Sequence, residues 1–239
     1  MILKELSKNV YYMQNDSHSD RPTLGYVKGD KFSIMIDTGN SPAHLELFYE
    51  GLKERGLEKP EIAVITHWHW DHTYAICAFD GQVIANKLTN KKLENMKAWE
   101  WTEEAMKERL ESGEEIEFCD EHIRIEYPDR SKIKVETADI IYDKKLSLDL
   151  GNINCDMELV GGPHEEDSSI VYIKEDKVLF VGDADCIDFY GKKEKYDKDK
   201  LEAYINKVKE IDFETYVHGH CAPMGREEAI NWLEDFLNE

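Results

Sequence analysis

Cysteine is scarce in this sequence, and its few copies lie far apart. The chain of 239 residues contains five cysteines and no Cys-x-x-Cys pair. They are Cys77, Cys119, Cys155, Cys186 and Cys221. An odd number of scattered cysteines in a chain of this size argues against a disulfide framework and against a closed thiolate metal site. We therefore expect reduced thiols and a cytoplasmic protein.

Long apolar runs are also missing. No run approaches the roughly 18 apolar residues of a membrane-spanning helix. The opening residues, Met1-Ile2-Leu3-Lys4-Glu5-Leu6, are too short and too charged for an export signal. With 6 prolines and 14 glycines, collagen-like or long disordered tracts are not expected. These absences predict an ordered globular fold with no membrane contact.

Basic residues are heavily outnumbered by acidic ones. The chain has 30 Lys and Arg against 51 Asp and Glu, which gives a formal net charge of -21. Such a field repels phosphate backbones and anionic membrane surfaces. The Lys-rich segment 192–195 is interleaved with an acidic residue, so we interpret it as a solvated face. We therefore expect a small-molecule substrate and no nucleic acid.

One stretch concentrates residues that bind metals, namely Thr66-His67-Trp68-His69-Trp70-Asp71-His72. It directly follows the apolar run 62–65, so a buried strand is expected to deliver three imidazoles and a carboxylate to its own end. Imidazole nitrogen and carboxylate oxygen suit zinc and other borderline divalent cations. We interpret this stretch as part of a catalytic metal site.

The rest of the chain alternates predicted strands and helices, as in an α/β fold. A β-meander is predicted over residues 10–36, and Ser41-Pro42 is a favourable start for a helix that ends near Arg55. Further strands are predicted at 62–65, 82–85, 133–135, 140–143, 157–160, 170–173, 178–181 and 215–217. Helices are predicted at about 198–210 and from about Arg226.

The segment 87–117 differs from its surroundings. It is rich in Lys and Glu, and its apolar residues recur at helical intervals, at Leu88, Leu93, Met96, Trp99, Met106 and Leu110. This pattern predicts one or two inserted amphipathic helices. Trp99 and Trp101 have two possible roles, as a lid over the metal cleft or as packing on the body, and we favour packing.

Three other predicted strands are each followed by a possible metal ligand, at His164, Asp183 and His220. A single histidine after a strand is usually structural. Four strand ends that each present His or Asp, however, can converge on one cleft in a sheet-based fold. The recurrence therefore predicts one composite site.

In chain order, the motifs are His67-Trp68-His69-Trp70-Asp71-His72, Gly162-Pro163-His164, Gly182-Asp183 and Gly219-His220, with Asp37-Thr38-Gly39 upstream. This ordered set resembles the metallo-β-lactamase superfamily over residues 20 to 225. The resemblance implies a four-layer αββα sandwich of two mixed β-sheets. We expect a single domain over residues 1–239, with a helical insertion at about 87–117.

The resemblance also implies a dinuclear metal site. His67, His69 and His164 match the ligands of a first metal. Asp71, His72 and His220 match those of a second, and Asp183 matches a bridging carboxylate. We expect two divalent metal ions, with zinc (Zn) preferred and manganese or iron as alternatives. Such a pair generates a nucleophilic hydroxide at neutral pH, and Asp71 or Asp183 is the catalytic residue expected to move its proton.

Three further residues lie near these motifs. His218 lies two residues before His220 and can point the same way, but the family's last ligand follows a glycine, so we favour His220. Asp37 is interpreted as a support that orients a ligand. Related lactonases place a tyrosine against the substrate carbonyl, and Tyr190 matches it only loosely.

Two aromatic residues and three histidines complete the candidates. Trp68 and Trp70 either form an apolar wall of the cleft or pack beneath its loop. His18, His44 and His122 lie outside the motifs, and we expect them at the surface or in loops.

Three functions follow from these observations. The first is a metal-dependent hydrolase that acts on a small ester, lactone, thioester, amide or phosphoester. The second is an iron-dependent oxidoreductase that resembles persulfide dioxygenases, with His67, His164 and Asp183 around a single iron. The third is a non-catalytic metal-binding module, which ranks last because no ligand is missing. A secreted β-lactamase is disfavoured because no export signal is seen.

Overall fold

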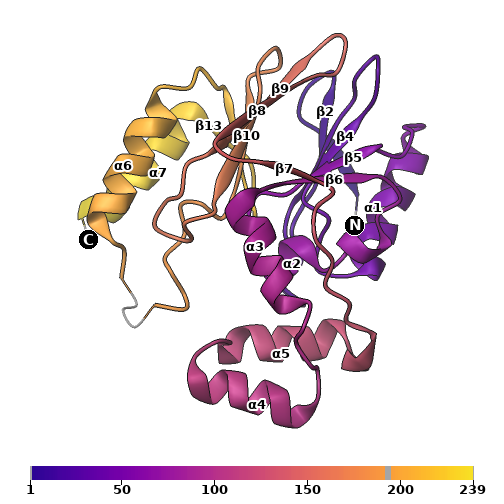
Figure 1. Cartoon of the computed structure of the whole chain (residues 1–239). Coiled ribbons are helices and arrows are strands. Elements are labelled where there is room, and N and C mark those ends of the chain that lie inside the picture. Colours follow the sequence, from indigo (N-terminus) through magenta and orange to yellow (C-terminus); the bar gives the residue numbers. More distant parts are fainter. Residues whose placement is uncertain (1, 192–194, 239) are drawn as a thin grey trace.

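Two mixed β-sheets, of seven and six strands, pack face to face and carry helices on their outer faces (Figure 1). This computed structural model describes residues 2–191 and 195–238. Most of the lysine-rich segment for which a solvated face was expected, residues 192–194, lies outside the described residues. Within the described ranges, none of the helices combines the length and apolar character that a bilayer span requires.

The first sheet follows chain order from β1 to β7. Its strands are β1 (Leu3–Glu5), β2 (Val10–Met13), β3 (Leu24–Val27), β4 (Ile34–Ile36), β5 (Ile62–Val64), β6 (Gln82–Asn86) and β7 (Ile140–Tyr142). The strands from β1 to β4 pair antiparallel, and those from β4 to β7 pair parallel. Parallel neighbours need long crossovers, and helices supply them.

The second sheet has the order β13-β12-β11-β10-β9-β8. Its strands are β8 (Lys145–Asp149), β9 (Asn154–Leu159), β10 (Ser169–Ile173), β11 (Val178–Gly182), β12 (Thr215–His218) and β13 (Met224–Gly225). Only β11 and β12 pair parallel, and helix α6 (Lys198–Lys209) connects them. The short edge strands β1 and β13 were not predicted.

Alternation along the strands sorts the core into layers. Ile34 and Ile36 face the second sheet, where they meet Phe180, whereas Met35 faces the helices. On that outer face lie α1 (Pro42–Glu54), α2 (Trp70–Thr73), the 3-10 helix Ile76–Ala78 and α3 (Lys87–Met96). Helices α6 and α7 (Arg226–Asn238) cover the other sheet. The predicted αββα sandwich is therefore confirmed.

The segment after β6 is more helical than predicted. It contains α3, α4 (Glu103–Ser112) and α5 (Glu117–Glu126), followed by a 3-10 helix at Arg130–Lys132. The strand predicted at 133–135 is absent. Ile133 and Val135 are both buried, so this extended segment alternates like a strand, but it pairs with no neighbour, and β7 takes the place beside β6.

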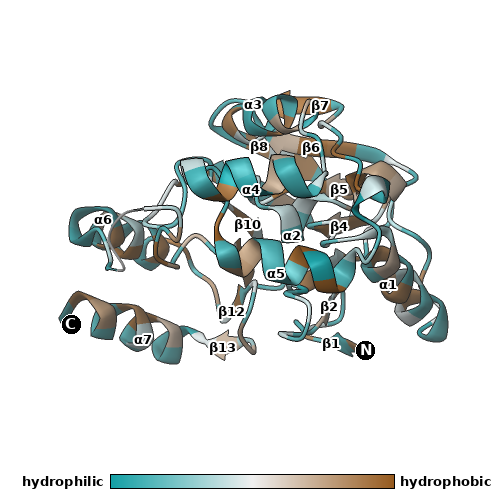
Figure 2. Ribbon diagram, turned by 90° about the horizontal axis from the view of Figure 1, so that it is seen from below, coloured by the Kyte–Doolittle hydropathy of each residue, from teal (hydrophilic) through white to brown (hydrophobic). Residues whose placement is uncertain are grey.

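Helices α4 and α5 lie together across one edge of the sandwich, in front of the strands when the molecule is seen from below (Figure 2). The two tryptophans before α4 pack on the body of the protein. The rings of Trp101 and Tyr74 meet edge-on at 5.5 Å, and the Arg109 guanidinium lies 4.6 Å from the Trp99 ring. The packing role favoured for these tryptophans is confirmed.

Candidate metal centre

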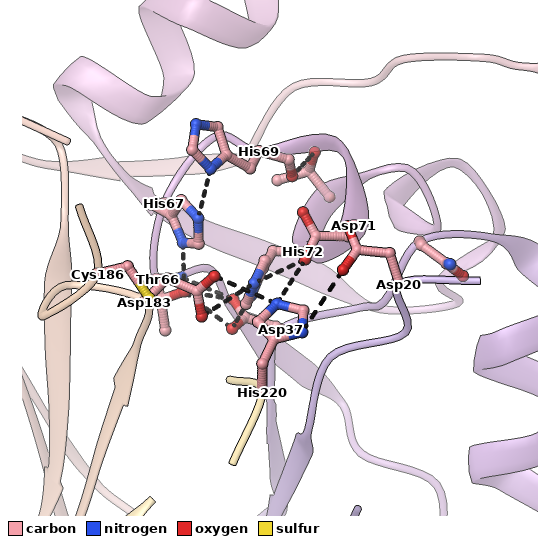
Figure 3. A network of polar contacts seen from close by, with 12 residues as sticks. Asp20, Asp37, Thr66, His67, His69, Asp71, His72, Asp183, Cys186 and His220 are labelled. Atoms are coloured by element: carbon pink, nitrogen blue, oxygen red, sulfur yellow. Dashed lines mark hydrogen bonds and ion pairs between the residues drawn. The ribbon is translucent and has the colours of Figure 1, made fainter. Parts of the chain in front are cut away.

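The residues predicted as metal ligands meet where β5, β11 and β12 end and β10 begins. They form two groups, and within each group the ligand atoms lie within 4.8 Å of one another. The first group is His67, His69 and His164, and the second is Asp71, His72, Asp183 and His220. All are buried except His220, whose side chain is 25% exposed. Figure 3 shows most of them pointing toward one another.

The first group is three converging imidazoles. His69 Nδ1 lies 3.1 Å from His67 Nε2 and 2.9 Å from His164 Nε2. Nitrogen ligands around a tetrahedral zinc ion, with bonds of about 2.0–2.1 Å, are separated by about 3.3 Å. The three nitrogens are therefore close to the spacing that a single bound metal requires.

The outward nitrogens of two rings are hydrogen-bonded, and that of His69 lies beside a carboxylate without a hydrogen bond. His164 Nδ1 donates to the Ile187 carbonyl at 2.8 Å, and His69 Nε2 lies 3.5 Å from a Glu165 oxygen. Thr66 Oγ1 lies 2.9 Å from the Asp37 carboxylate, to which it donates, so it accepts from His67 Nδ1 at 3.1 Å. These bonds leave lone pairs facing inward, as metal ligation requires.

The second group combines two imidazoles and two carboxylates. His72 Nε2 lies 3.1 Å from Asp71 Oδ2, and His220 Nε2 lies 3.1 Å from the same oxygen and 3.2 Å from Asp183 Oδ2. His72 Nε2 and Asp183 Oδ1 are buried without a hydrogen-bond partner. Such orphaned groups cost about 1–3 kcal/mol each, so these donor atoms fit a cation that would complete their contacts.

The pKa shifts favour the metal-binding form for Asp71, Asp183, His67 and His164, whereas the carboxylates beside His69, His72 and His220 outweigh burial and raise the pKa of these three imidazoles. Burial alone would raise the pKa of Asp71 and Asp183, but His72 and His220 beside them hold both values well below the ordinary one. Burial and the neighbouring imidazoles keep the pKa of His67 well below its usual value and lower that of His164 to about 4. The carboxylates are thus charged and these two rings neutral, the forms that bind metals.

Two acidic residues support the second group. Asp37, which has a positive φ of 56°, accepts from His72 Nδ1 at 2.8 Å and from the Thr66 amide at 2.8 Å, so its predicted role as a support is confirmed. Asp20 Oδ1 lies 3.6 Å from His220 Nδ1, and burial together with Asp71 raises the pKa of Asp20 to about 7. Asp20 was missed because it lies in the loop between β2 and β3, outside every motif.

His218 is held in a different way. Its Nδ1 accepts the backbone N–H of His220 at 2.7 Å, so its ring proton is on Nε2, which lies 3.1 Å from Asp185 Oδ1. Asp185, also missed from sequence, in turn accepts from Tyr216 at 2.7 Å. His218, Asp183 and Cys186 form a third close group, but the protonated Nε2 disfavours His218 as a ligand.

Two glycines allow the strand ends to approach one another. A Cβ atom at Gly219 would lie 2.1 Å from Asp183 Oδ1, and one at Gly182 would lie 2.5 Å from Thr66 Oγ1. Gly182 also has a positive φ of 55°, which side chains rarely adopt. Close contacts therefore explain why glycine precedes Asp183 and His220 in the sequence motifs.

A cavity of about 430 Å³ opens over the metal groups. Its walls come from the loop after β2, the start of α5 and the loop after β11. A second cavity of about 750 Å³ lies on the other side of His164 and Tyr190, which line both. Trp68 and Trp70 are both buried in the core, and neither lines the cavity over the metal groups, although Trp68 also borders the second cavity; the packing interpretation therefore holds for both.

Tyr190 and His44 complete the comparison with the sequence. The Tyr190 hydroxyl donates to Glu115 at 2.9 Å, and its ring lies 5.4 Å from that of His69. The expectation of a surface or loop position is wrong for His44, which is fully buried in α1, where burial lowers its pKa to about 3. His18 is exposed and His122 is partly exposed.

Solved structures share this architecture at low sequence identity. A metallo-β-lactamase from Pontibacter korlensis has a TM-score of 0.67 and 18% identity, with 99% of this chain and 98% of that chain covered. A metallo-β-lactamase family protein from Thermus thermophilus has a TM-score of 0.69 and 16% identity, covering 98% and 80%. A sec-alkylsulfatase from Pseudomonas sp. has a TM-score of 0.69 and 15% identity, covering 99% and 41%.

At such identities these structures establish the fold alone, and no curated protein sequence matches significantly. The sequence model described as "Metallo-beta-lactamase superfamily" matches residues 22–220. That match covers most of the chain and includes every member of the two metal-ligand groups. The chain belongs to the metallo-β-lactamase superfamily.

Proposed function

We propose that this protein is a hydrolase with a dinuclear metal site, in a single domain over residues 1–239. His67, His69 and His164 would hold one ion, Asp71, His72 and His220 the other, and Asp183 would bridge them. Family membership and the clusters of His and Asp support metal-dependent hydrolysis. The observation that carries the proposal is that two groups of ligand residues lie side by side. Hydrogen bonds from surrounding residues orient the rings of His67, His72 and His164 in these groups.

Two divalent ions, zinc in the first place, would lower the pKa of a bound water toward neutrality and polarise the bond to be cleaved. The protein's own contribution is placement and proton transfer. Asp71 and Asp183 both line the cavity, so either carboxylate can take a proton from a reacting group or return it. The cavity volume of about 430 Å³ suits a small ester, lactone, thioester, amide or phosphoester.

The alternative functions use less of this arrangement. A single iron held by His67, His164 and Asp183 would leave the second group, with its supporting Asp37, without a role. A non-catalytic binding module would have no need for a cavity directly over the ligands. Both remain distinguishable from a hydrolase by metal content and by the reaction catalysed.

Metal analysis with an activity panel tests the proposal. We expect two zinc or manganese ions per chain, and hydrolysis of p-nitrophenyl acetate, a simple lactone or bis-p-nitrophenyl phosphate that stops with a chelator and returns with zinc. One iron per chain together with oxygen uptake would contradict the hydrolase. Fully loaded protein that hydrolyses none of the panel would support the binding module.

Replacement of Asp71 tests its part in proton transfer. Asp71→Asn keeps the side-chain shape but removes the base, so kcat should fall by about 10²–10⁴-fold in protein whose metal content has been verified. Asp80→Asn, at an exposed position, is the matched control and should leave kcat unchanged. Normal turnover by Asp71→Asn with both metals bound would exclude this role.

A further inference from the structure

We propose that the cavity over the metal groups selects uncharged substrates with an apolar acyl or alkyl group, and that it disfavours substrates that carry an additional anionic group. This inference rests on the proposed hydrolase function and narrows its substrate class. Three observations carry it: an apolar wall, a lining whose described residues include no Lys or Arg, and a rigid aromatic side chain between the two cavities.

The apolar wall comes from two segments that are far apart in the chain. Ile116, Phe118 and Cys119, at the start of α5, face Phe189 and Tyr190 from the loop after β11. Phe118 and Phe189 are each 52% exposed, which is unusual for such large apolar side chains. Both line the cavity, so a bound apolar group would remove their surface from water.

Charge in the cavity is of one sign away from the metal ligands. Asp20 contributes a carboxyl group beside His220, and the described part of the lining contains no Lys or Arg. Lys91, Lys92 and Lys200 line the neighbouring cavity instead. A sulfate, phosphate or carboxylate at the far end of a substrate would therefore lose water without gaining a cationic partner, in a chain of net charge -21.

The wall between the cavities is held in place before any ligand binds. The Tyr190 hydroxyl donates to the buried Glu115 at 2.9 Å, and the Tyr190 ring lies 5.6 Å from that of Trp68 and 5.4 Å from that of His69. Tyr190 lines the cavity in this fixed position. The apolar part of a substrate can therefore bind without an ordering cost on this side.

Calorimetric titration of the zinc-loaded protein with three hydroxamic acids tests the selectivity directly. Acetohydroxamic, hexanohydroxamic and adipic monohydroxamic acid share one metal-binding group and differ in their tail. Each buried methylene adds at most about fourfold in affinity, so we expect hexanohydroxamic acid to bind at least about tenfold more tightly than either of the others. Equal binding of the hexanoic and adipic compounds, or no binding of the hexanoic one, would overturn the inference.

Variants on one helix locate the effect. Phe118→Ala should reduce the preference for the hexanoic over the acetic compound several-fold, because it removes a large part of the apolar wall. The matched control is Ile125→Ala, which replaces a side chain on the same helix that is 45% exposed and lies outside the cavity lining. A chain-length preference that Phe118→Ala leaves unchanged would contradict the proposed wall.

Hydrolysis rates separate this inference from the proposed function. With p-nitrophenyl hexanoate and mono-p-nitrophenyl adipate as substrates, kcat/KM should favour the hexanoate by at least about tenfold. Hydrolysis of both esters at equal rates would overturn the selectivity while it supports the hydrolase. Selective hexanohydroxamate binding by fully loaded protein that hydrolyses neither these esters nor any compound of the activity panel would support the selectivity and overturn the hydrolase.

Discussion

Single residues in this site are arranged so that three of the imidazoles use both of their nitrogens. In His67, His72 and His164 one nitrogen faces the metal group, and the other is fixed by a hydrogen bond to a hydroxyl, carboxylate or carbonyl group. His220 differs because its backbone is fixed as well, through the bond from its N–H to His218 Nδ1. The position of His220 in the second group therefore depends on His218, a residue that contributes no ligand to that group.

Replacement of His218 should loosen the second metal while the first stays bound. His218→Ala removes the acceptor for the His220 amide, and we expect zinc affinity at the second group to fall about 10–100-fold, as for other residues that orient ligands. His218→Asn should restore much of it, because an asparagine side chain can accept the N–H two residues on. Competition with a zinc chelator measures both affinities. Equal affinities in the alanine variant and the unmodified protein would exclude this role.

The ligand candidates could be predicted because each lies in an ordered sequence motif near the end of a predicted apolar strand. Asp20 and Asp185 could not, since their roles come from contacts across the fold, to His220 and to His218 respectively. Burial of His44 was missed for the same reason, because it depends on how the face of α1 packs. Residue type and spacing identify candidate ligands, whereas the groups that orient them depend on tertiary structure.

Among the elements, α5 shows how a helix can be overlooked. Ile123-Arg124-Ile125 alternates like a strand, yet the buried residues Cys119, Asp120, Ile123 and Tyr127 recur at helical spacing. Glu126, at the end of α5, accepts hydrogen bonds from Arg21 and Ser41. The helix that supplies a wall of the cavity is thereby tied to the loop that carries Asp20.

Glu126 should give a pH-dependent contribution to stability. Burial opposes its charge, but bonds from Arg21 and Ser41 hold its pKa below the ordinary value. The contribution is therefore present above the unfolded pKa, near 4.5, and is lost as the pH falls through the folded pKa. In metal-free protein, Glu126→Gln should lower the free energy of unfolding by about 1–3 kcal/mol at neutral pH.

Urea unfolding of both proteins at about pH 7 and about pH 3 measures this difference, which should shrink at the lower value. Glu121→Gln is the control on the same helix, because Glu121 is exposed, and it should change stability by less than about 0.5 kcal/mol. A Glu126→Gln effect that persists undiminished in acid would show that the charge is not its origin.

At the scale of the whole molecule, two sheets contribute to one site. His67, His69, Asp71 and His72 follow a strand of the first sheet, and His164, Asp183 and His220 belong to the second. The layer order followed from the family resemblance that the ordered motifs carry. The lack of pairing at 133–135 could not be predicted, because alternation of apolar residues indicates burial and not hydrogen bonding to a neighbouring strand.

Metal removal should destabilise the whole fold. A ligand present at about 100 times its Kd stabilises a protein by about 2.7 kcal/mol, which for a chain of this size corresponds to about 5–10 °C in Tm. Calorimetry with and without a chelator measures this shift. The double variant His69→Ala with His72→Ala should show no response to the chelator. An unchanged Tm in the unmodified protein on complete removal of metal would contradict the expectation.

The division of the ligands between the sheets has a consequence for how the protein is made. A nascent chain that has emerged only through β9 carries His67, His69, Asp71 and His72 but can complete neither group. The first group closes only once His164 is available, and the second only once His220 is. Under the proposed function, metal capture would thus come late in synthesis, and a bound ion would mark chains whose two sheets have docked.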